Sequence, residues 1–477
     1  GARRAPVRPL GPRLPYGLLR RSDADARMIR YHARWVIPVA GSAVADGVVA
    51  VRGQRITYVG PRAGAPPGED VDLGNVLLMP GLVNAHCHLE LTAMRGFLEE
   101  LEFGDWILRL ATAKRAVLTS VEMLVDAATL GIAEGLRAGV TTYADTCHSG
   151  VVIDALRECG VRGVMYQEVF GPDPAQCATS LAELREQVAA ARSLETPLVR
   201  VGVSPHAPYT VSDELYKAAT RFALDERLPM ALHIAEAAVE SQLVERGEGR
   251  FADGLRARGI DVRPRADSSV GLLHRLGVLD ASPLLIHCVR LSNGDVERIA
   301  ATGSSVAHCP AANAKLGHGI APVRELLDAG VRVGLGSDSV ASNNRMDLLE
   351  EARLAALLQD ARLGKHDGMT TAEALELATL GGAQALGLAD RIGSLDPGKD
   401  ADLAAFSLDV ERAVPLHDPP AAALHALRGS DAIFVAVAGR ALVRDGALTG
   451  AAADPELRTR LQAQAEALQE WLRAMRR

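Results

Sequence analysis

Three features are scarce in this chain of 477 residues, and each scarcity excludes a class of protein. No apolar run approaches the ~18 consecutive residues of a membrane-spanning helix, so we expect no membrane partner. A formal charge of -7 provides no large positive field for a phosphate backbone, so we expect no nucleic acid partner. The six cysteines show no CxxC spacing in a chain too long to need disulfide staples, which favours reduced thiols and a cytoplasmic location.

The N-terminal segment lacks the apolar core of a signal peptide. Residues 1–27 are rich in Arg, Pro and Gly, and we predict a disordered leader there, with Met28 as the natural start of the protein. A targeting segment is the alternative interpretation.

Both ends of the remaining chain show the alternation of apolar and polar residues that is typical of β-strands. It occurs in DGVVAVRGQRITYVG near the N-terminus and in AIFVAVAGRALVRDGALTG near the C-terminus. We therefore predict one small β-sandwich built from residues 28–79 and 391–452. Leucines at helical spacing predict a C-terminal helix in residues 453–477 that packs against the parent domain.

Between these ends, short apolar runs alternate with Ala- and Leu-rich helical stretches. Eight such units in residues 80–390 predict an α/β fold, a (β/α)8 TIM-like barrel whose active site lies at the carboxyl ends of its strands. The predicted strands lie in NVLLMPGLVNAHCH, GVTTYADTC, RGVMYQEVF, LVRVGVSPH, PMALHIAE, PLLIHCV, SSVAHCP and VRVGLGSDS.

Imidazoles and carboxylates gather where these strands end, so the barrel would bring them to one rim. Because side chains alternate along a strand, His86 and His88 point to one side and Cys87 to the other, which favours a metal-binding pair over a catalytic thiolate. When the HxH motif is considered alone, the alternative interpretation is that its two histidines bind no metal. The full set is His86, His88, Asp145, His148, His206, His233, Glu236, His287, His308 and Asp338.

The recurrence of such residues at several strand ends favours the metal. His233 and Glu236 are three residues apart, the wrong parity for one strand face, so the strand must end and turn after Ile234. Three imidazoles and one carboxylate suit a single Zn²⁺ or Fe²⁺ that deprotonates a bound water near neutral pH. Asp338 would accept the water proton, Glu236 would protonate the atom under attack or the leaving group, and His287 would align the hydroxide.

These motifs resemble those of the amidohydrolase superfamily. PGLVNAHCH, HIAE, IHCV and GSDSVASNN are similar to its motifs on strands one, five, six and eight, and GSLDPGKDADL to its return into the small domain. The resemblance implies one divalent metal, Zn²⁺ or Fe²⁺, with Glu236 and His287 as catalytic residues. His206 stands where the binuclear branch has a carboxylated lysine, which supports one metal rather than two. The implied ligands are His86, His88, His233 and Asp338.

Within the superfamily the chain most resembles deaminases of adenine nucleosides, through SPHAPYT, LTAMRG followed by DWI, and AHCPAANAKLGHGIAPV. The likeness implies a homo-oligomeric hydrolase of carbon–nitrogen bonds and a purine-type substrate attacked by hydroxide at C6, with release of ammonia. It also implies substrate contacts from Trp106 and His206. The stretch HLEL, which adds Glu90, is closer to the 6-aminodeoxyfutalosine deaminases of menaquinone biosynthesis than to the methylthioadenosine and S-adenosylhomocysteine deaminases.

Several of these residues also have purely structural interpretations. Trp106 would be a buried anchor, and His308 would be a core histidine bonded to the backbone. Glu90 would cap the chain or pair with Arg95. Asp145 and His148 would support the rim. Histidines outside the strand-end pattern are interpreted as surface or packing residues: His32, His274, His318, His366, His417 and His425.

Two other functions stay open at this point. The same scaffold would serve a related hydrolase of another heterocycle, by deamination of guanine or pterin or by dechlorination of a triazine, because specificity resides in loops. A catalytically silent binding module is the alternative from a different class.

Overall fold

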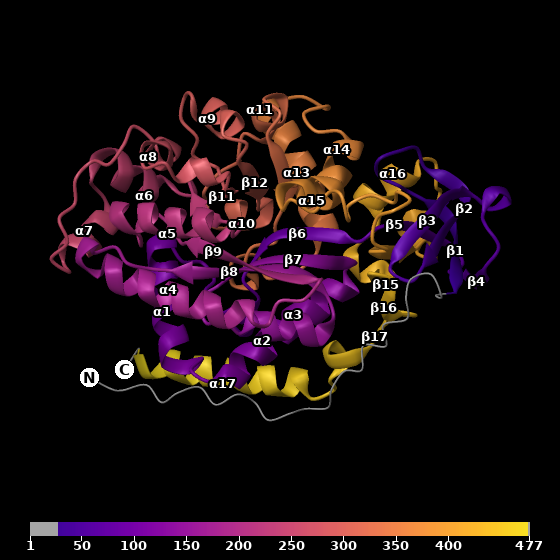
Figure 1. Cartoon of the computed structure of the whole chain (residues 1–477), viewed down its shortest axis with the longest axis horizontal. Coiled ribbons are helices and arrows are strands. Elements are labelled where there is room, and N and C mark those ends of the chain that lie inside the picture. The colour runs from indigo at the N-terminus through magenta and orange to yellow at the C-terminus, as the bar shows by residue number, and fades with distance from the viewer. Residues whose placement is uncertain (1–26, 476–477) are drawn as a thin grey trace.

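A computed structural model of the protein describes residues 27–475, so the predicted leader lies outside the described residues except for Arg27. Helices surround a group of parallel strands, and a separate β-sheet lies at one end of the molecule (Figure 1). The chain is therefore a mixed α/β protein, as the sequence predicts.

The two ends of the chain meet in one nine-stranded sheet, ordered β17-β16-β15-β14-β5-β1-β2-β3 with β4 beside β1. An antiparallel pairing of β5 with β14 joins the N-terminal part to the C-terminal part. Within residues 27–475 these segments form no second, facing sheet, so the predicted sandwich is not confirmed. The strands are β1 (Met28–Val36), β2 (Val44–Arg52), β3 (Arg55–Pro61), β4 (Glu69–Asp72), β5 (Val76–Pro80), β14 (Leu403–Ser407), β15 (Ala432–Val437), β16 (Arg440–Arg444) and β17 (Ala447–Leu448).

The eight strands predicted for the central region all form, and neighbouring strands are parallel. They make two four-stranded sheets, β6-β7-β8-β9 and β10-β11-β12-β13. Single parallel bridges, Val203 with Met230 and Cys87 with Asp338, connect the two sheets at both seams. Among the described residues, these eight strands therefore do not form one continuous closed barrel. The strands are β6 (Leu82–Cys87), β7 (Val140–Cys147), β8 (Arg162–Val169), β9 (Val199–Pro205), β10 (Ala231–Ile234), β11 (Leu284–His287), β12 (Ser305–His308) and β13 (Arg332–Leu335).

Gly81 marks the point where the chain passes from one sheet to the other. The run NVLLMPGLVNAHCH was predicted as one strand, but β5 pairs with β14 whereas β6 pairs with β7. A Cβ at Gly81 would lie 2.2 Å from Oγ1 of Thr141, so a residue with a side chain cannot take this place without a shift. The glycine allows the close approach that starts the parallel strands.

Helices follow the parallel strands and cover them (Figure 1). No helix within residues 27–475 is both long and apolar enough to cross a membrane. The helices are α1 (Phe103–Val117), α2 (Val121–Arg137), α3 (Val152–Cys159), α4 (Cys177–Arg192), α5 (Asp213–Glu226), α6 (Ala238–Ser241), α7 (Arg250–Arg256), α8 (Ser269–Arg275), α9 (Asp295–Ala301), α10 (Pro310–Lys315), α11 (Val323–Asp328), α12 (Val340–Asn343), α13 (Leu348–Leu363), α14 (Thr371–Glu376), α15 (Gly382–Ala385), α16 (Pro419–Ala421) and α17 (Leu457–Met475).

The last helix, α17, packs against α2. It buries Leu457, Leu461 and Leu468, which have helical spacing. Both guanidinium contacts from Arg460 to the Asp126 carboxylate on α2 are 2.7 Å long. The helix is held by an apolar stripe and one bidentate ion pair, and none of these residues lines the cavity of the candidate active site described below.

Arg162, at the start of β8, ties the parallel strands to the nine-stranded sheet. Its side chain is 1% exposed and donates to Asp402 Oδ2 and to Asp400 Oδ2, each at 2.9 Å. Asp402 also accepts the backbone N–H of Ala438 at 2.7 Å. A buried charge of this kind is stable only while its partner is present.

We expect Arg162→Met to lower the free energy of unfolding by about 3–5 kcal/mol, because it leaves the buried Asp402 carboxylate without its cation. Urea unfolding followed by circular dichroism measures the loss. The matched control is Arg192→Met, which removes an ion pair with Glu226 whose side chains are 42% and 48% exposed. It should cost less than about 1 kcal/mol. Equal losses in the two variants would contradict the role of Arg162.

Candidate metal centre and active site

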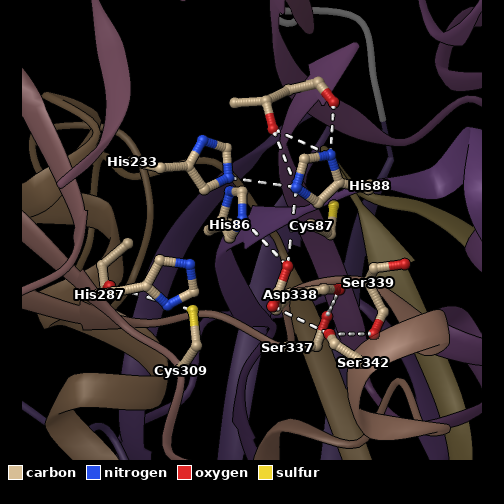
Figure 2. Close-up of polar contacts among 12 residues, drawn as sticks. His86, Cys87, His88, His233, His287, Cys309, Ser337, Asp338, Ser339 and Ser342 are labelled. Carbon is tan, nitrogen blue, oxygen red and sulfur yellow. Dashed lines mark hydrogen bonds and ion pairs between the residues drawn. The ribbon is translucent and has the colours of Figure 1, made fainter. Parts of the chain in front are cut away.

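The HxH motif lies at the end of β6, and its two histidines face one side, as predicted (Figure 2). The ring centroids of His86 and His88 are 4.8 Å apart. Cys87 points away from them and is fully buried, with Sγ 3.6 Å from Oδ2 of Asp145. Burial raises the pKa of the Cys87 thiol well above its usual value, so the thiol stays protonated. Burial and the orientation away from the histidines both argue against a catalytic thiolate at this position.

Four side chains from three strand ends converge at one point. Nε2 of His88 lies 3.2 Å from Nε2 of His233, at the end of β10. Oδ1 of Asp338, after β13, lies 3.3 Å from Nε2 of His86 and 3.6 Å from Nε2 of His88. Tetrahedral ligands ~2.1 Å from a zinc ion are separated by about 3.4 Å. His86, His88 and Asp338 form one group whose ligand atoms all lie within 4.8 Å of one another, and His233 joins a second such group with His86 and His287.

The imidazoles in this cluster have the protonation state that metal binding requires. Burial lowers the pKa of His86 and of His88 to about 4 and that of His233 to about 3, so their lone pairs are free at neutral pH. Among the described residues, both ring nitrogens of His86 and Nδ1 of His233 lack a hydrogen-bond partner. Buried nitrogens without partners are costly, and a metal would satisfy those that face the cluster. The donor set of three nitrogens and one oxygen suits Zn²⁺ or Fe²⁺.

The loop after β13 holds Asp338 in a strained conformation. Its φ of 57° lies in the left-handed region, which is costly for a residue with a side chain. Oδ2 accepts a hydrogen bond from Oγ of Ser342 at 2.9 Å, and the backbone N–H donates to the carbonyl of His86 at 3.0 Å. Asn84 on β6 holds the preceding Ser337 through both its amide oxygen and its amide nitrogen. The loop thus fixes Oδ1 towards the histidines.

Glu236 lies beyond a turn that ends the strand, as its separation of three residues from His233 predicts. β10 ends at Ile234, and Ala235 has a φ of 51°. The carboxylate of Glu240 accepts the backbone N–H of Ala235 at 2.8 Å and that of Glu236 at 3.1 Å, which holds the turn. Oε1 of Glu236 lies 3.5 Å from Nε2 of His287. Glu236 belongs to none of the groups of possible metal ligands among the described residues, although its neighbour His287 does.

His318 was predicted to be a surface or packing residue; it is buried and packed, and it also lies beside Glu236, a contact that the prediction did not include. Its side chain is 3% exposed, and its Nε2 lies 3.3 Å from Oε1 of Glu236. The ring of Phe103 packs edge-on against it, with centroids 4.6 Å apart. His318 follows α10 in the loop LGHG rather than a strand, so the rule based on strand ends could not find it. A histidine between two glycines within the quoted AHCPAANAKLGHGIAPV was the available signal.

The charge state of Glu236 follows from these neighbours. Burial raises its pKa, but the imidazoles of His287, His318 and His233 outweigh this effect and hold the pKa at about 2. Nδ1 of His287 lies 2.9 Å from Oδ1 of Asn313, which can only accept, so Nδ1 carries the proton. Nε2 of His287 is then free to accept a proton or a hydrogen bond.

The metal cluster opens into a cavity of about 430 Å³. The predicted substrate residues Trp106, His206 and Glu90 all line it. Trp106 is also 6% exposed and stacks on Phe103 at a centroid distance of 6.2 Å, so it is both an anchor and part of the wall. Apolar residues make up much of the lining: Leu91, Phe103, Trp106, Ile107, Leu110, Phe170 and Leu316.

Glu90 does not pair with Arg95, which was one structural interpretation of it. Arg95 pairs with Glu134, whereas Glu90 forms an ion pair with Lys114 of α1. His308 is buried as expected for a core histidine, but neither ring nitrogen has a hydrogen-bond partner within residues 27–475. The predicted bond from His308 to the backbone is therefore absent from the described part of the chain.

Known proteins resemble this chain in both sequence and fold. A model of the amidohydrolase family matches residues 77–443. This chain belongs to the amidohydrolase family. A 5-methylthioadenosine/S-adenosylhomocysteine deaminase of Moorella thermoacetica is 33% identical over 420 residues, which cover 86% of this chain and 93% of that protein. The protein is accordingly a hydrolase that acts on carbon–nitrogen bonds other than peptide bonds.

Solved structures of this family resemble the fold over almost its whole length. An adenosine deaminase of Xanthomonas campestris with bound zinc has a TM-score of 0.82 and 31% identity, covering 94% of this chain and 98% of its own. An atrazine chlorohydrolase of Arthrobacter aurescens TC1, complexed with zinc, has a TM-score of 0.77 and 25% identity, covering 92% and 99%. Zinc is thus bound in two solved structures of similar fold.

We expect His233→Ala to reduce bound metal to less than about one tenth of the wild-type content, because it removes one of the four predicted ligands. Plasma emission spectroscopy of the purified protein measures the metal. His274→Ala, an exposed histidine outside the cluster, is the control and should keep the wild-type content. Full metal occupancy in His233→Ala would show that other residues hold the metal.

We expect His318→Phe to lower kcat by on the order of 10-fold to 100-fold while metal content is unchanged, because a group that orients a reacting residue has effects of this size. The phenyl ring keeps the packing on Phe103 but removes the nitrogen that faces Glu236. His417→Phe, an exposed site, is the matched control. Unchanged kcat in His318→Phe would return His318 to a packing role.

Proposed function

We propose that this protein is a metal-dependent hydrolytic deaminase of an adenine nucleoside derivative. The observation that carries the proposal is the position of Glu236. Its carboxylate lies beside the cluster of three imidazoles and one carboxylate, contacts His287 and His318, and lines the same cavity. Deamination of an amidine carbon needs a water nucleophile and a proton donor on the adjacent ring nitrogen, and this arrangement provides a place for each.

His86, His88, His233 and Asp338 would hold the metal, which when bound supplies a water nucleophile that deprotonates near neutral pH. Glu236 is ionised in its imidazole environment, so it is equipped to receive a proton first and to pass it to N1 of the ring afterwards. Asp338 is the second carboxylate in reach of a proton from the attacking water. His287, with Nδ1–H held by Asn313, directs its Nε2 towards the reacting atoms.

The walls of the cavity suit a flat heterocycle. Trp106, Phe103 and Ile107 offer apolar surface on which a purine would stack, and they exclude water from the proton-transfer region. His206, whose Nδ1 is held by Oγ1 of Thr210 at 2.8 Å, presents its other ring nitrogen for a polar contact. A purine-type small molecule is therefore the expected partner, and assembly of several copies of the chain stays a proposal.

Three substrates follow from this proposal: methylthioadenosine, S-adenosylhomocysteine and 6-aminodeoxyfutalosine. The first two are the substrates in the name of the Moorella relative, which is 33% identical. The third rests on the HLEL stretch, which places Glu90 in the cavity wall. The fold likeness to an atrazine chlorohydrolase supports a second candidate function, hydrolysis of a substituted triazine.

A panel of substrates tests the proposal. Ammonia release and loss of adenine absorbance are measured for methylthioadenosine, S-adenosylhomocysteine, 6-aminodeoxyfutalosine and adenosine, with guanine, a pterin and atrazine beside them. We expect turnover of at least one adenine nucleoside, loss of that turnover on chelation, and its return with Zn²⁺. Turnover of atrazine or a pterin with no activity on the nucleosides would replace the proposed substrate class.

We expect Glu236→Gln to lower kcat by about 10²–10⁴-fold on the best substrate of this panel, with metal content unchanged, because the amide cannot relay a proton. Steady-state kinetics and metal analysis of the same preparation measure both quantities. The control is Glu248→Gln, whose side chain is 69% exposed. Near wild-type turnover in Glu236→Gln with metal bound would show that the proton follows another route.

A further inference from the structure

A second cavity, of about 690 Å³, lies where α2 meets the start of α17 and the short helix η11 (Gly450–Ala453). The two long helices run side by side in this region (Figure 1). The second cavity shares none of its described lining residues with the cavity at the candidate metal centre. Its volume falls within the range of about 300–1,000 Å³ that is typical of small-molecule sites. The proposed function makes no use of it.

Three carboxylates line the second cavity, and each already accepts hydrogen bonds from the protein. Glu134 accepts from the guanidinium of Arg95 and from a backbone N–H. Asp347 accepts three backbone N–H groups, at 2.9, 3.0 and 3.1 Å. Asp454 accepts one guanidinium and one backbone N–H, each at 2.9 Å. The negative charge in the lining is therefore held by donors within the protein.

The guanidiniums in the lining are not balanced in the same way. Arg95 and Arg345 form ion pairs with carboxylates. Arg137, in the last turn of α2, and Arg458, in the first turn of α17, are exposed. Within residues 27–475 neither of these two guanidiniums has a hydrogen-bond or ion-pair partner. A hollow surface that carries unbalanced charge of one sign concentrates small ions of the opposite sign.

The rest of the lining favours a ligand that also has an apolar part. A guanidinium offers a planar fork of donors that fits two oxygens of a phosphate or carboxylate, so two guanidiniums suit two negative charges. Between them lies mostly hydrocarbon surface, on which an apolar group would be sheltered from water. The apolar lining residues are Leu130, Ala133, Ala138, Met346, Leu448, Ala452 and Leu457.

One wall of the second cavity is pre-formed by the loop that carries Asp338. Met346 is 1% exposed, and its Sδ lies 3.0 Å from Oγ of Ser337 and 3.2 Å from Nδ2 of Asn84. Its backbone N–H donates to Glu134 at 3.1 Å. A wall that is already fixed lowers the cost of ordering the site when a ligand binds.

We propose that the second cavity is a binding site for a small organic dianion, a phosphate monoester or a dicarboxylate with an apolar body, held by Arg137 and Arg458. The site is independent of the proposed deaminase chemistry, because none of its described residues lines the other cavity. An occupant would contact the loop of Asp338 from outside the metal centre.

The test is isothermal titration calorimetry of the full-length, metal-loaded protein with phenyl phosphate, with isophthalate and with uncharged benzyl alcohol. We expect saturable binding of at least one dianion and none of the alcohol. Arg137→Met and Arg458→Met should each weaken that binding by about 10-fold, because each removes one charge-assisted contact. Methionine retains the apolar stem of the side chain, so the shape of the cavity changes little. The double variant should show no saturable binding.

The control variant is Arg473→Met, which removes an exposed guanidinium from α17 outside the second cavity and should bind with wild-type affinity. Circular dichroism and metal content of each variant show that a loss of affinity is not a loss of folding.

Binding of only one of the two dianions would support the site and name its head group. Three results would overturn the inference. The first is no saturable binding of either dianion below about 10 mM. The second is unchanged affinity in both single variants and in the double variant, which would place the dianion elsewhere, for example at the metal. The third is binding of benzyl alcohol as tight as that of the dianions.

Discussion

The arrangement of parallel strands is the constraint on which the site depends. In two sheets of parallel strands every carboxyl end faces the same rim, so residues far apart in the chain are brought together there. His88 and His233 are 145 positions apart, yet their Nε2 atoms lie 3.2 Å from each other. The cluster is buried, and among the described residues both ring nitrogens of His86 and Nδ1 of His233 lack a hydrogen-bond partner, an unfavourable state that a bound metal would relieve where these nitrogens face it.

Holding this cluster requires strain and buried polar bonds elsewhere. Ala235, His287 and Asp338 all have positive φ angles, and each lies where a strand turns into a site loop. Glu240 holds the first of these turns through two backbone amides, and Asn313 fixes the ring of His287. Side chains outside the cavity lining thus determine where the reacting groups point, because each strained turn persists only while its hydrogen bonds are made.

The cavity has two chemically different sides. Glu236, His287 and His318 form a compact group. The imidazoles of these two histidines, together with that of His233, keep the carboxylate ionised, which suits proton transfer. On the other side, burial raises the pKa of Glu168 to about 8, opposed by the Lys114 cation and supported by the Glu90 charge. Carboxyls in one cavity therefore differ in pKa because their neighbours differ.

The sequence by itself determined the features that depend on neighbouring residues: eight apolar strands, the shared face of His86 and His88, and the turn between His233 and Glu236. These follow from the alternation of side chains along a strand, which is a local rule. Only the tertiary structure decided that His318 contacts Glu236, that Glu90 pairs with Lys114 rather than Arg95, and that the N- and C-terminal strands form one sheet instead of a sandwich. Such contacts depend on how loops and helices pack over the rim, and no spacing within one segment encodes that packing.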